Sequence, residues 1–159
     1  MKIIEELPPL KDFDRLKNEV LSLLEKYNYP RQIGLQSLDP NNEEWIIEDG
    51  RPITKDTDYK YLHKDLRGTA IEELINSLSA YRSRIMRMPA RSCYSVHADV
   101  TKRIHIPIVT DPQAWMVWPH HNTCKYLQLG KIYLTDTTKL HSAFNGSAVD
   151  RIHLVLCVL

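Results

Sequence analysis

The sequence predicts a mainly β protein in which helices flank a jelly roll, the cupin-like pair of sheets also called a double-stranded β-helix. Two observations lead to this prediction. Helical periodicity is confined to the first 83 residues, and from residue 84 onward about seven short strand-like runs follow without a helical period. Helices followed by many short strands are typical of a sheet pair with helices packed outside it.

The first helix is expected over residues 12–27, where apolar side chains recur at helical spacing and Pro30 ends the segment. Residues 32–38 and 44–47 are expected to form short strands on either side of a turn at residues 39–42. The apolar face of the helix comprises Phe13, Leu16, Val20, Leu23, Leu24 and Tyr27.

A second helix is expected to begin at residues 69–72, because their sequence Thr-Ala-Ile-Glu is a capping box. Its apolar residues recur at helical spacing as far as Tyr81 and predict a buried face. This face comprises Ile71, Leu74, Ile75, Leu78 and Tyr81.

Composition and charge limit the classes of function. The chain has 159 residues, with 21 Lys and Arg against 20 Asp and Glu, and a formal net charge of +1. This length suits a single domain over residues 1–159, and the balanced charge argues against nucleic-acid binding. A basic cluster, interpreted as a solvated strand edge with one member facing a substrate, comprises Arg82, Arg84, Arg87 and Arg91.

Cysteine use and the N-terminus indicate the cellular compartment. The cysteines are far apart and form no Cys-x-x-Cys pair, so neither a disulfide framework nor a structural zinc site is expected. The N-terminus lacks the apolar stretch of a signal peptide, and no segment resembles a membrane span. We therefore expect a cytoplasmic protein.

The most informative motif is His97 and Asp99, separated by one residue, together with the distant His141. Two imidazoles and one carboxylate are the ligands of the facial triads that hold non-haem Fe(II) and leave coordination positions open. If the first motif is on a strand, its two side chains share a face. A second His-x-Asp match, at residues 63–65, follows a polar run and is interpreted as a solvated loop.

Arg151 lies ten residues beyond His141. A guanidinium group matches a carboxylate through two parallel hydrogen bonds, so Arg151 is a candidate to hold a dicarboxylate co-substrate such as 2-oxoglutarate. The loop of residues 145–150 is long enough to bring His141 and Arg151 to adjacent strands of one sheet. The alternative role for Arg151 is a surface ion pair with Asp150.

Several linked stretches resemble the aspartyl/asparaginyl β-hydroxylase-like family of 2-oxoglutarate/Fe(II)-dependent dioxygenases, which includes free-proline hydroxylases. The resemblance covers residues 84–159, the metal-binding jelly-roll core, and leaves residues 1–83 as helical and short-strand support. One departure is Pro-Ala-Arg at residues 89–91, where many relatives have Pro-Gly. The matching stretches are RIMRMP at 84–89, HAD at 97–99, RIHIP at 103–107, GK at 130–131, HSAFN at 141–145 and DRIHL at 150–154.

The resemblance implies an enzyme that hydroxylates an amino-acid side chain, free or within a peptide or protein, while 2-oxoglutarate is decarboxylated to succinate and CO2. The implied cofactors are Fe(II), 2-oxoglutarate as co-substrate, and O2. His97, Asp99 and His141 are the implied catalytic metal ligands. The residues expected at the co-substrate are Arg151, His105, Arg103 and Ser92, with Tyr94 as a second hydroxyl donor beside Ser92.

Alternatives remain open for individual residues and for the function. Arg103 and His105 share a strand face and would contact the co-substrate or an acidic or zwitterionic substrate; otherwise they are ordinary polar residues of a half-exposed strand. Asn145 is expected to stabilise the turn after His141, with a hydrogen bond to the substrate as the alternative, and His153 is expected to be a core histidine. The alternative function is a non-catalytic cupin-like module that binds a metal or ligand. The expected partner is an amino-acid or peptide substrate, with neither nucleic acid nor membrane.

Overall fold

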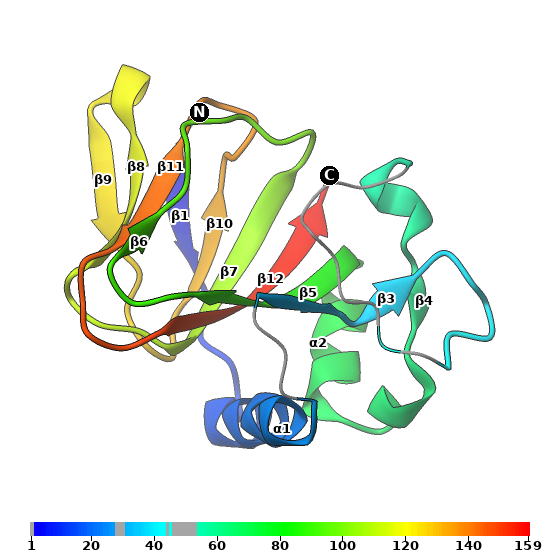
Figure 1. Cartoon of the computed structure of the whole chain (residues 1–159). Helices are drawn as coiled ribbons and strands as arrows, with labels where there is room; N and C mark the ends of the chain where they lie inside the picture. The colour runs from blue at the N-terminus through cyan, green and yellow to red at the C-terminus, as the bar shows by residue number, and fades with distance from the viewer. Residues whose placement is uncertain (1, 28–30, 44, 46–53) are drawn as a thin grey trace.

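The computed structural model describes residues 2–27, 31–43, 45 and 54–159, and it consists mainly of two antiparallel sheets (Figure 1). This arrangement confirms the predicted mainly β jelly roll. The six-stranded sheet has the order β1 (Ile4–Leu7), β10 (Ile132–Thr135), β7 (Lys102–Val109), β12 (Arg151–Val158), β5 (Tyr81–Met88) and β2 (Gln32–Gly34). The four-stranded sheet has the order β6 (Ser92–Cys93), β11 (Ser142–Asn145), β8 (Ala114–Trp118) and β9 (Thr123–Tyr126).

Helices and a short hairpin complete the fold. The α-helices pack against the outer face of the larger sheet, where Leu16 and Ile71 join the same apolar core as Leu154. No helix in the described ranges is long and apolar enough to span a bilayer. The remaining elements are α1 (Phe13–Lys26), α2 (Ala70–Ser77), the hairpin of β3 (Gln36–Ser37) and β4 (Tyr61–Leu62), and the 3-10 turns η1 (Asp56–Asp58), η2 (Lys64–Leu66) and η3 (Pro119–His121).

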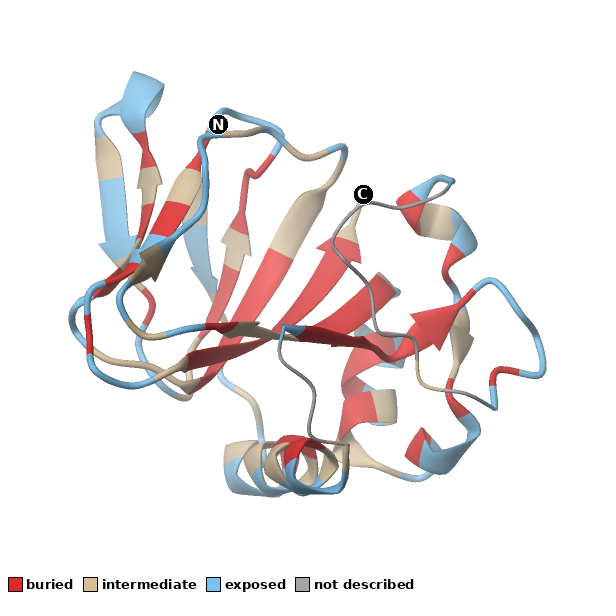
Figure 2. Cartoon of the chain, viewed as in Figure 1, coloured by how far each residue is buried: buried red, intermediate tan, exposed pale blue. Residues whose placement is uncertain are grey.

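Alternation along the central strands separates an apolar outer face of the larger sheet from a polar inner face. On β12, Leu154 and Leu156 belong to the core under the helices. Arg151 and Val155 instead line a cavity on the opposite side. Figure 2 shows that β7, β12 and β5 are mostly buried. Each buried Leu or Ile contributes about 1.5–3 kcal/mol, so a register slip of one residue, which would turn these side chains into the cavity, is strongly disfavoured.

A second apolar cluster lies between the two sheets. Met116 and Ala143, from the smaller sheet, belong to it and also line the cavity. This cluster therefore forms an apolar wall beside the polar inner face of the larger sheet. Its buried members are Met88, Met116, Trp118, Leu127, Tyr133 and Ala143.

The two predicted helices are present, and the predicted end of the second is wrong. The Thr69 hydroxyl caps α2 by accepting a hydrogen bond from the backbone N–H of Glu72 at 3.2 Å. The helix ends at Ser77, and Tyr81 begins β5 instead of extending the helical face. Ser79 has a φ of 47°, in the left-handed region, which a continuing right-handed helix cannot contain. The helix therefore ends although apolar residues continue at helical spacing as far as Tyr81.

The first 83 residues contribute strands to the larger sheet itself. The stretch 32–38 forms two strands instead of one: β2 pairs with β5, and β3 pairs with β4. β1 and β2 are the two edge strands of the six-stranded sheet. The expected strand at residues 44–47 lies outside the described residues, apart from Trp45.

The arginine cluster on β5 is buried, which corrects its interpretation as a solvated strand edge. Arg82 and Arg84 are each 1% exposed, because β5 lies between β12 and β2 and is not an edge strand. β2 comes from a distant part of the chain, and local periodicity gave no sign that it covers β5. Arg91 is exposed, as predicted. Arg82 and Arg84 both line the cavity, so two members of the cluster face inward where one was expected.

A candidate metal and co-substrate site

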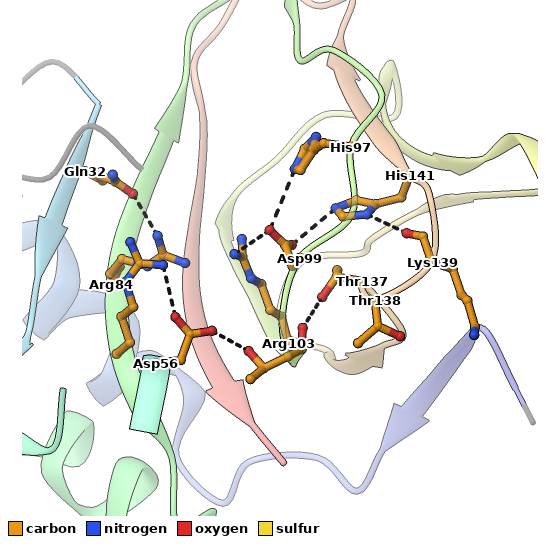
Figure 3. Close-up of polar contacts among 12 residues, drawn as sticks. Gln32, Asp56, Arg84, His97, Asp99, Arg103, Thr137, Thr138, Lys139 and His141 are labelled. Carbon is orange, nitrogen blue, oxygen red and sulfur yellow. Dashed lines mark hydrogen bonds and ion pairs between the residues drawn. The ribbon is translucent and has the colours of Figure 1, made fainter. Parts of the chain in front are cut away.

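His97, Asp99 and His141 converge at the mouth of the cavity (Figure 3). They are positioned by two extended segments that lie side by side. The backbone N–H of His97 donates to the carbonyl of His141 at 2.9 Å, and the reverse bond measures 2.8 Å. The segment is not a regular strand, contrary to the prediction, since β6 ends at Cys93 and His97 forms only an isolated bridge. Its extended backbone nevertheless directs His97 and Asp99 to one side.

The ligand atoms of the triad lie close to one another. His141 Nε2 is 3.5 Å from Asp99 Oδ2, and His97 Nε2 is 3.9 Å from Asp99 Oδ1. All three ligand atoms lie within 4.8 Å of one another. Ligands at about 2.1 Å from one divalent ion and at right angles to each other are about 3 Å apart. Small side-chain rotations are therefore enough to close the triad around one ion.

Local hydrogen bonds fix the tautomers of both histidines. His97 Nδ1 lies 2.7 Å from the Ser95 carbonyl, and His141 Nδ1 lies 2.9 Å from the Lys139 carbonyl. A carbonyl only accepts, so each Nδ1 carries the proton and each Nε2 lone pair is directed at Asp99. Burial lowers the pKa of His141, which favours the neutral ring.

The chemistry of this donor set fits a divalent cation. Asp99 Oδ2 is buried and accepts no hydrogen bond, and two imidazole lone pairs face the same carboxylate. Arg103 Nη2 donates to the other oxygen, Asp99 Oδ1, at 2.7 Å and so orients the carboxylate. Two imidazole nitrogens and a carboxylate oxygen that face one another in this way are suited to share one divalent cation.

A cavity of about 600 Å³ connects the triad with the inner face of the larger sheet. This volume is within the range of small-molecule sites. The triad side is partly open, because His97 is half-buried, whereas the opposite wall is buried. The buried charged and polar residues that line it include Gln32, Asp56, Arg84, His105 and Arg151.

Arg151 begins β12 and is only 6% exposed. Burial lowers its pKa to about 10, and its Nε has no hydrogen-bond partner. The alternative of an ion pair with Asp150 is wrong. The Asp150 carboxylate instead accepts a hydrogen bond from the backbone N–H of Ala90 at 3.0 Å and lies 3.9 Å from Arg87 Nε. A buried guanidinium without an anionic partner among the described residues is suited to an anionic ligand.

His141 and Arg151 face each other from different sheets, and the prediction of adjacent strands in one sheet is wrong. His141 directly precedes β11 of the smaller sheet, whereas Arg151 begins β12 of the larger sheet. Asn145 stabilises the crossing, as predicted: its Nδ2 donates to the Val149 carbonyl at 2.8 Å, and its Oδ1 accepts from the Ser147 hydroxyl at 2.7 Å. The His97, Asp99 and His141 triad and Arg151 therefore stand on opposite walls of one cavity.

His105 and His153 are both buried on the inner face of the larger sheet. Their Nδ1 atoms are 3.3 Å apart. Burial keeps the pKa of both well below the ordinary value, so both rings are neutral and one of the two Nδ1 atoms donates to the other. Arg103 and His105 both line the cavity, as their spacing predicts, and His153 is the buried core histidine that was expected.

Two other residues lie in surroundings that the sequence did not indicate. Ser92 is not among the described residues that line the cavity, and its hydroxyl donates to the Pro89 carbonyl at 2.6 Å. Tyr94 does line the cavity.

His63 is buried and stacks on Trp45 with ring centroids 3.6 Å apart, so the interpretation as a solvated loop is wrong. His63 does not belong to the His/Asp group found in the described residues.

Sequence reasoning missed the wall of the cavity formed by Gln32, Asp56, Arg82 and Arg84. The alternation of arginine with other residues along β5 was a usable signal, because residues 82 and 84 share a face with the cavity-lining Met86. Asp56 gave no such signal, because it lies in a short polar turn that is distant in sequence from Asp99 and His141.

Comparison with known proteins shows one family match and several related folds. Residues 69–159 match the family model described as aspartyl/asparaginyl beta-hydroxylase. A prolyl-4-hydroxylase structure from Pseudomonas putida is 11% identical, with 99% of this chain and 93% of that chain covered and a TM-score of 0.55. An oxidoreductase of the 2OG-Fe(II) oxygenase family from Burkholderia pseudomallei is 16% identical, with 98% and 84% covered and a TM-score of 0.54. A truncated viral collagen prolyl hydroxylase from Paramecium Bursaria Chlorella virus-1 is 14% identical, with 99% and 91% covered and a TM-score of 0.52. No curated protein sequence matches the chain, and at these identities the solved structures show a shared fold.

Proposed function

The chain belongs to the aspartyl/asparaginyl β-hydroxylase family, and on this premise we propose that it is a 2-oxoglutarate- and Fe(II)-dependent dioxygenase that hydroxylates an amino-acid side chain, free or within a peptide. One observation carries this proposal. The convergent ligand atoms of His97, Asp99 and His141 open into the same cavity as the buried guanidinium of Arg151, which has no anionic partner in the part of the chain that the structure describes.

The iron would be held by His97 Nε2, His141 Nε2 and the Asp99 carboxylate. When bound, iron and 2-oxoglutarate supply the oxidative chemistry: 2-oxoglutarate loses CO2 to give succinate, one atom of O2 enters succinate, and the other becomes the hydroxyl group of the product. The protein supplies a donor set with only three ligands, which leaves positions open for co-substrate and O2. Arg103, bonded to Asp99 Oδ1, keeps the other carboxylate oxygen turned toward the two imidazoles.

The co-substrate is oriented by the inner face of the larger sheet. Arg151 offers a guanidinium fork for the distal carboxylate, and the neutral His105 ring lines the same cavity. Met116, Ala143 and Val155 line the adjoining surface and exclude water from the reacting groups. The substrate enters at the exposed side of the triad, where Tyr94 and Ala98 line the mouth.

The prolyl hydroxylase names of two similar structures support an amino-acid or peptide substrate. The alternative of a non-catalytic binding module has no observation in its favour. A buried arginine that has no ion pair among the described residues destabilises the folded chain, which argues against a module that binds no anion. A module that binds an anionic ligand without turnover would form no hydroxylated product in the assay below.

Succinate formation tests the proposal. Purified protein with Fe(II), O2 and 2-oxoglutarate is screened against free amino acids and short peptides, and succinate and hydroxylated product are quantified by mass spectrometry. We expect one substrate to raise succinate formation with equimolar product, and His141→Ala to abolish both. His121→Ala, which removes an exposed imidazole on η3, is the matched control and is expected to retain activity. Succinate formation that persists in His141→Ala would contradict the assigned ligand set.

A further inference from the structure

A chain of buried polar contacts links Asp56 to the segment that carries Asp99 (Figure 3). Asp56 lies in η1, before the region that matches the family model. Its Oδ2 accepts a hydrogen bond from the Thr101 hydroxyl at 2.7 Å. Thr101 follows Asp99 by two residues, so this contact reaches the metal-binding segment directly.

The Asp56 end of this chain is rigidly held. Asp56 Oδ1 lies 3.3 Å from Arg82 Nη1, in an ion pair whose side chains are 2% and 1% exposed. The backbone N–H of Arg82 donates to the Tyr59 carbonyl at 2.8 Å, and its guanidinium lies over the Tyr59 ring. A buried ion pair fixed at both ends gives Asp56 one position.

The Asp99 end depends on polar contacts because it has no apolar anchor. Val100, between Asp99 and Thr101, is 80% exposed. Thr137 holds the segment from the other side: its hydroxyl donates to the Thr101 carbonyl at 2.8 Å, and its carbonyl accepts from the Asp99 N–H at 2.8 Å. The backbone bonds between His97 and His141 hold this segment before Asp99, and the contacts with Thr137 and Asp56 hold it at and after Asp99.

We infer that Asp56 is a positioning residue for the metal site, acting through Thr101 to fix the segment that presents Asp99. The inference rests on the proposed function, because it takes Asp99 as a metal ligand. According to this inference, Asp56 contributes to the metal affinity although it lies outside the region that matches the family model. Its side chain acts through Thr101 and contacts neither metal nor substrate. Removing a group that supports a metal ligand typically lowers metal affinity about 10–100-fold.

The test is calorimetric titration of Mn(II), as a redox-stable substitute for Fe(II), into metal-free protein. Thr101→Val removes the hydroxyl and keeps the shape and the buried ion pair, so the variant is expected to fold. We expect its Mn(II) dissociation constant to rise about 10-fold at a temperature where the variant is fully folded. Its melting temperature should fall by a few degrees, because the buried Asp56 Oδ2 loses a hydrogen bond. Thr101→Ser retains the hydroxyl and is expected to restore wild-type affinity. Thr110→Val is the matched control, because the Thr110 hydroxyl has no hydrogen-bond partner among the described residues, and it is expected to bind like wild type.

Turnover separates the inference from the proposed function. In Thr101→Val the Fe(II) concentration for half-maximal succinate formation should rise about 10-fold, while the rate at saturating Fe(II) stays near that of wild type. Wild-type Mn(II) affinity in Thr101→Val would overturn the positioning role and leave the proposed function intact. Failure of the wild-type protein to bind Mn(II) would overturn both.

Discussion

Replacing Arg151 by methionine is expected to stabilise the metal-free protein and to weaken 2-oxoglutarate binding, two effects of opposite sign from one substitution. Burial lowers the pKa of Arg151 to about 10, well below the ordinary value of an arginine. The folded protein thus holds this proton less tightly than the unfolded chain does. The charged side chain therefore destabilises the fold fully below pH 10, and this cost disappears only once the pH exceeds the pKa of arginine in the unfolded chain. One pKa unit corresponds to about 1.4 kcal/mol, so the cost at neutral pH is roughly 3 kcal/mol.

In the proposed function, the same guanidinium stabilises the bound co-substrate. Hydrogen bonds to a charged group contribute about 1.5–3 kcal/mol, which corresponds to a loss of about 10–150-fold in 2-oxoglutarate affinity when the fork is removed. Arg151 lines a cavity, so methionine at this position leaves no unfilled space in the apolar core.

Thermal unfolding followed by circular dichroism measures both effects. For a chain of this length, 1 kcal/mol shifts the melting temperature by about 2–4 °C, so metal-free Arg151→Met should melt about 6–12 °C above wild type. Addition of 2-oxoglutarate with Mn(II) should raise the melting temperature of wild type and have a much smaller effect on the variant. Arg87→Met, on the neighbouring strand and half-buried, is the control and should change neither. A variant that melts below wild type and still responds fully to 2-oxoglutarate would refute the reasoning.

Three further outcomes are expected. Burial keeps the pKa of His105 and His153 below the ordinary value of 6.5, so these rings take up protons in the unfolded chain before they do in the folded protein. The free energy of unfolding should therefore fall as the pH drops below 6.5, by up to about 1.4 kcal/mol per pH unit for each ring. His153→Leu should reduce this slope in urea titrations at pH 5 to 7, and an unchanged slope would show that the ring is protonated when folded. Asn145→Ala removes hydrogen bonds at the crossing between the sheets and should cost about 2–3 kcal/mol in the same titrations; a loss below 0.5 kcal/mol would remove its role. Asp99→Asn should weaken Mn(II) binding at least about 10-fold without lowering the melting temperature, and retained affinity would exclude Asp99 as a ligand.

The elements and residues predicted from sequence are those whose signal is local. Helical spacing located α1, a capping box located the start of α2, and the pairing of a His-x-Asp motif with His141 and Arg151 identified residues that meet in one cavity. In each case the chemistry or the periodicity is contained in a short stretch of chain.

The features that sequence did not predict depend on contacts between distant segments. β2 covers β5 and buries Arg82 and Arg84, although nothing near these arginines indicates the partner strand. The position of His141 and Arg151 on opposite sheets follows from where the chain crosses after β11, which a loop length does not determine. Asp56 becomes part of the site only because η1 packs against β5.

A crystal structure of the anaerobic complex with Fe(II) and 2-oxoglutarate tests the central claim most directly. We predict one iron at about 2.0–2.2 Å from His97 Nε2, His141 Nε2 and one Asp99 oxygen, by analogy with other first-row metal ions. The distal carboxylate of 2-oxoglutarate should accept two hydrogen bonds from Arg151 at about 2.7–2.9 Å. Iron bound elsewhere, or a co-substrate that leaves Arg151 unpaired, would contradict the account.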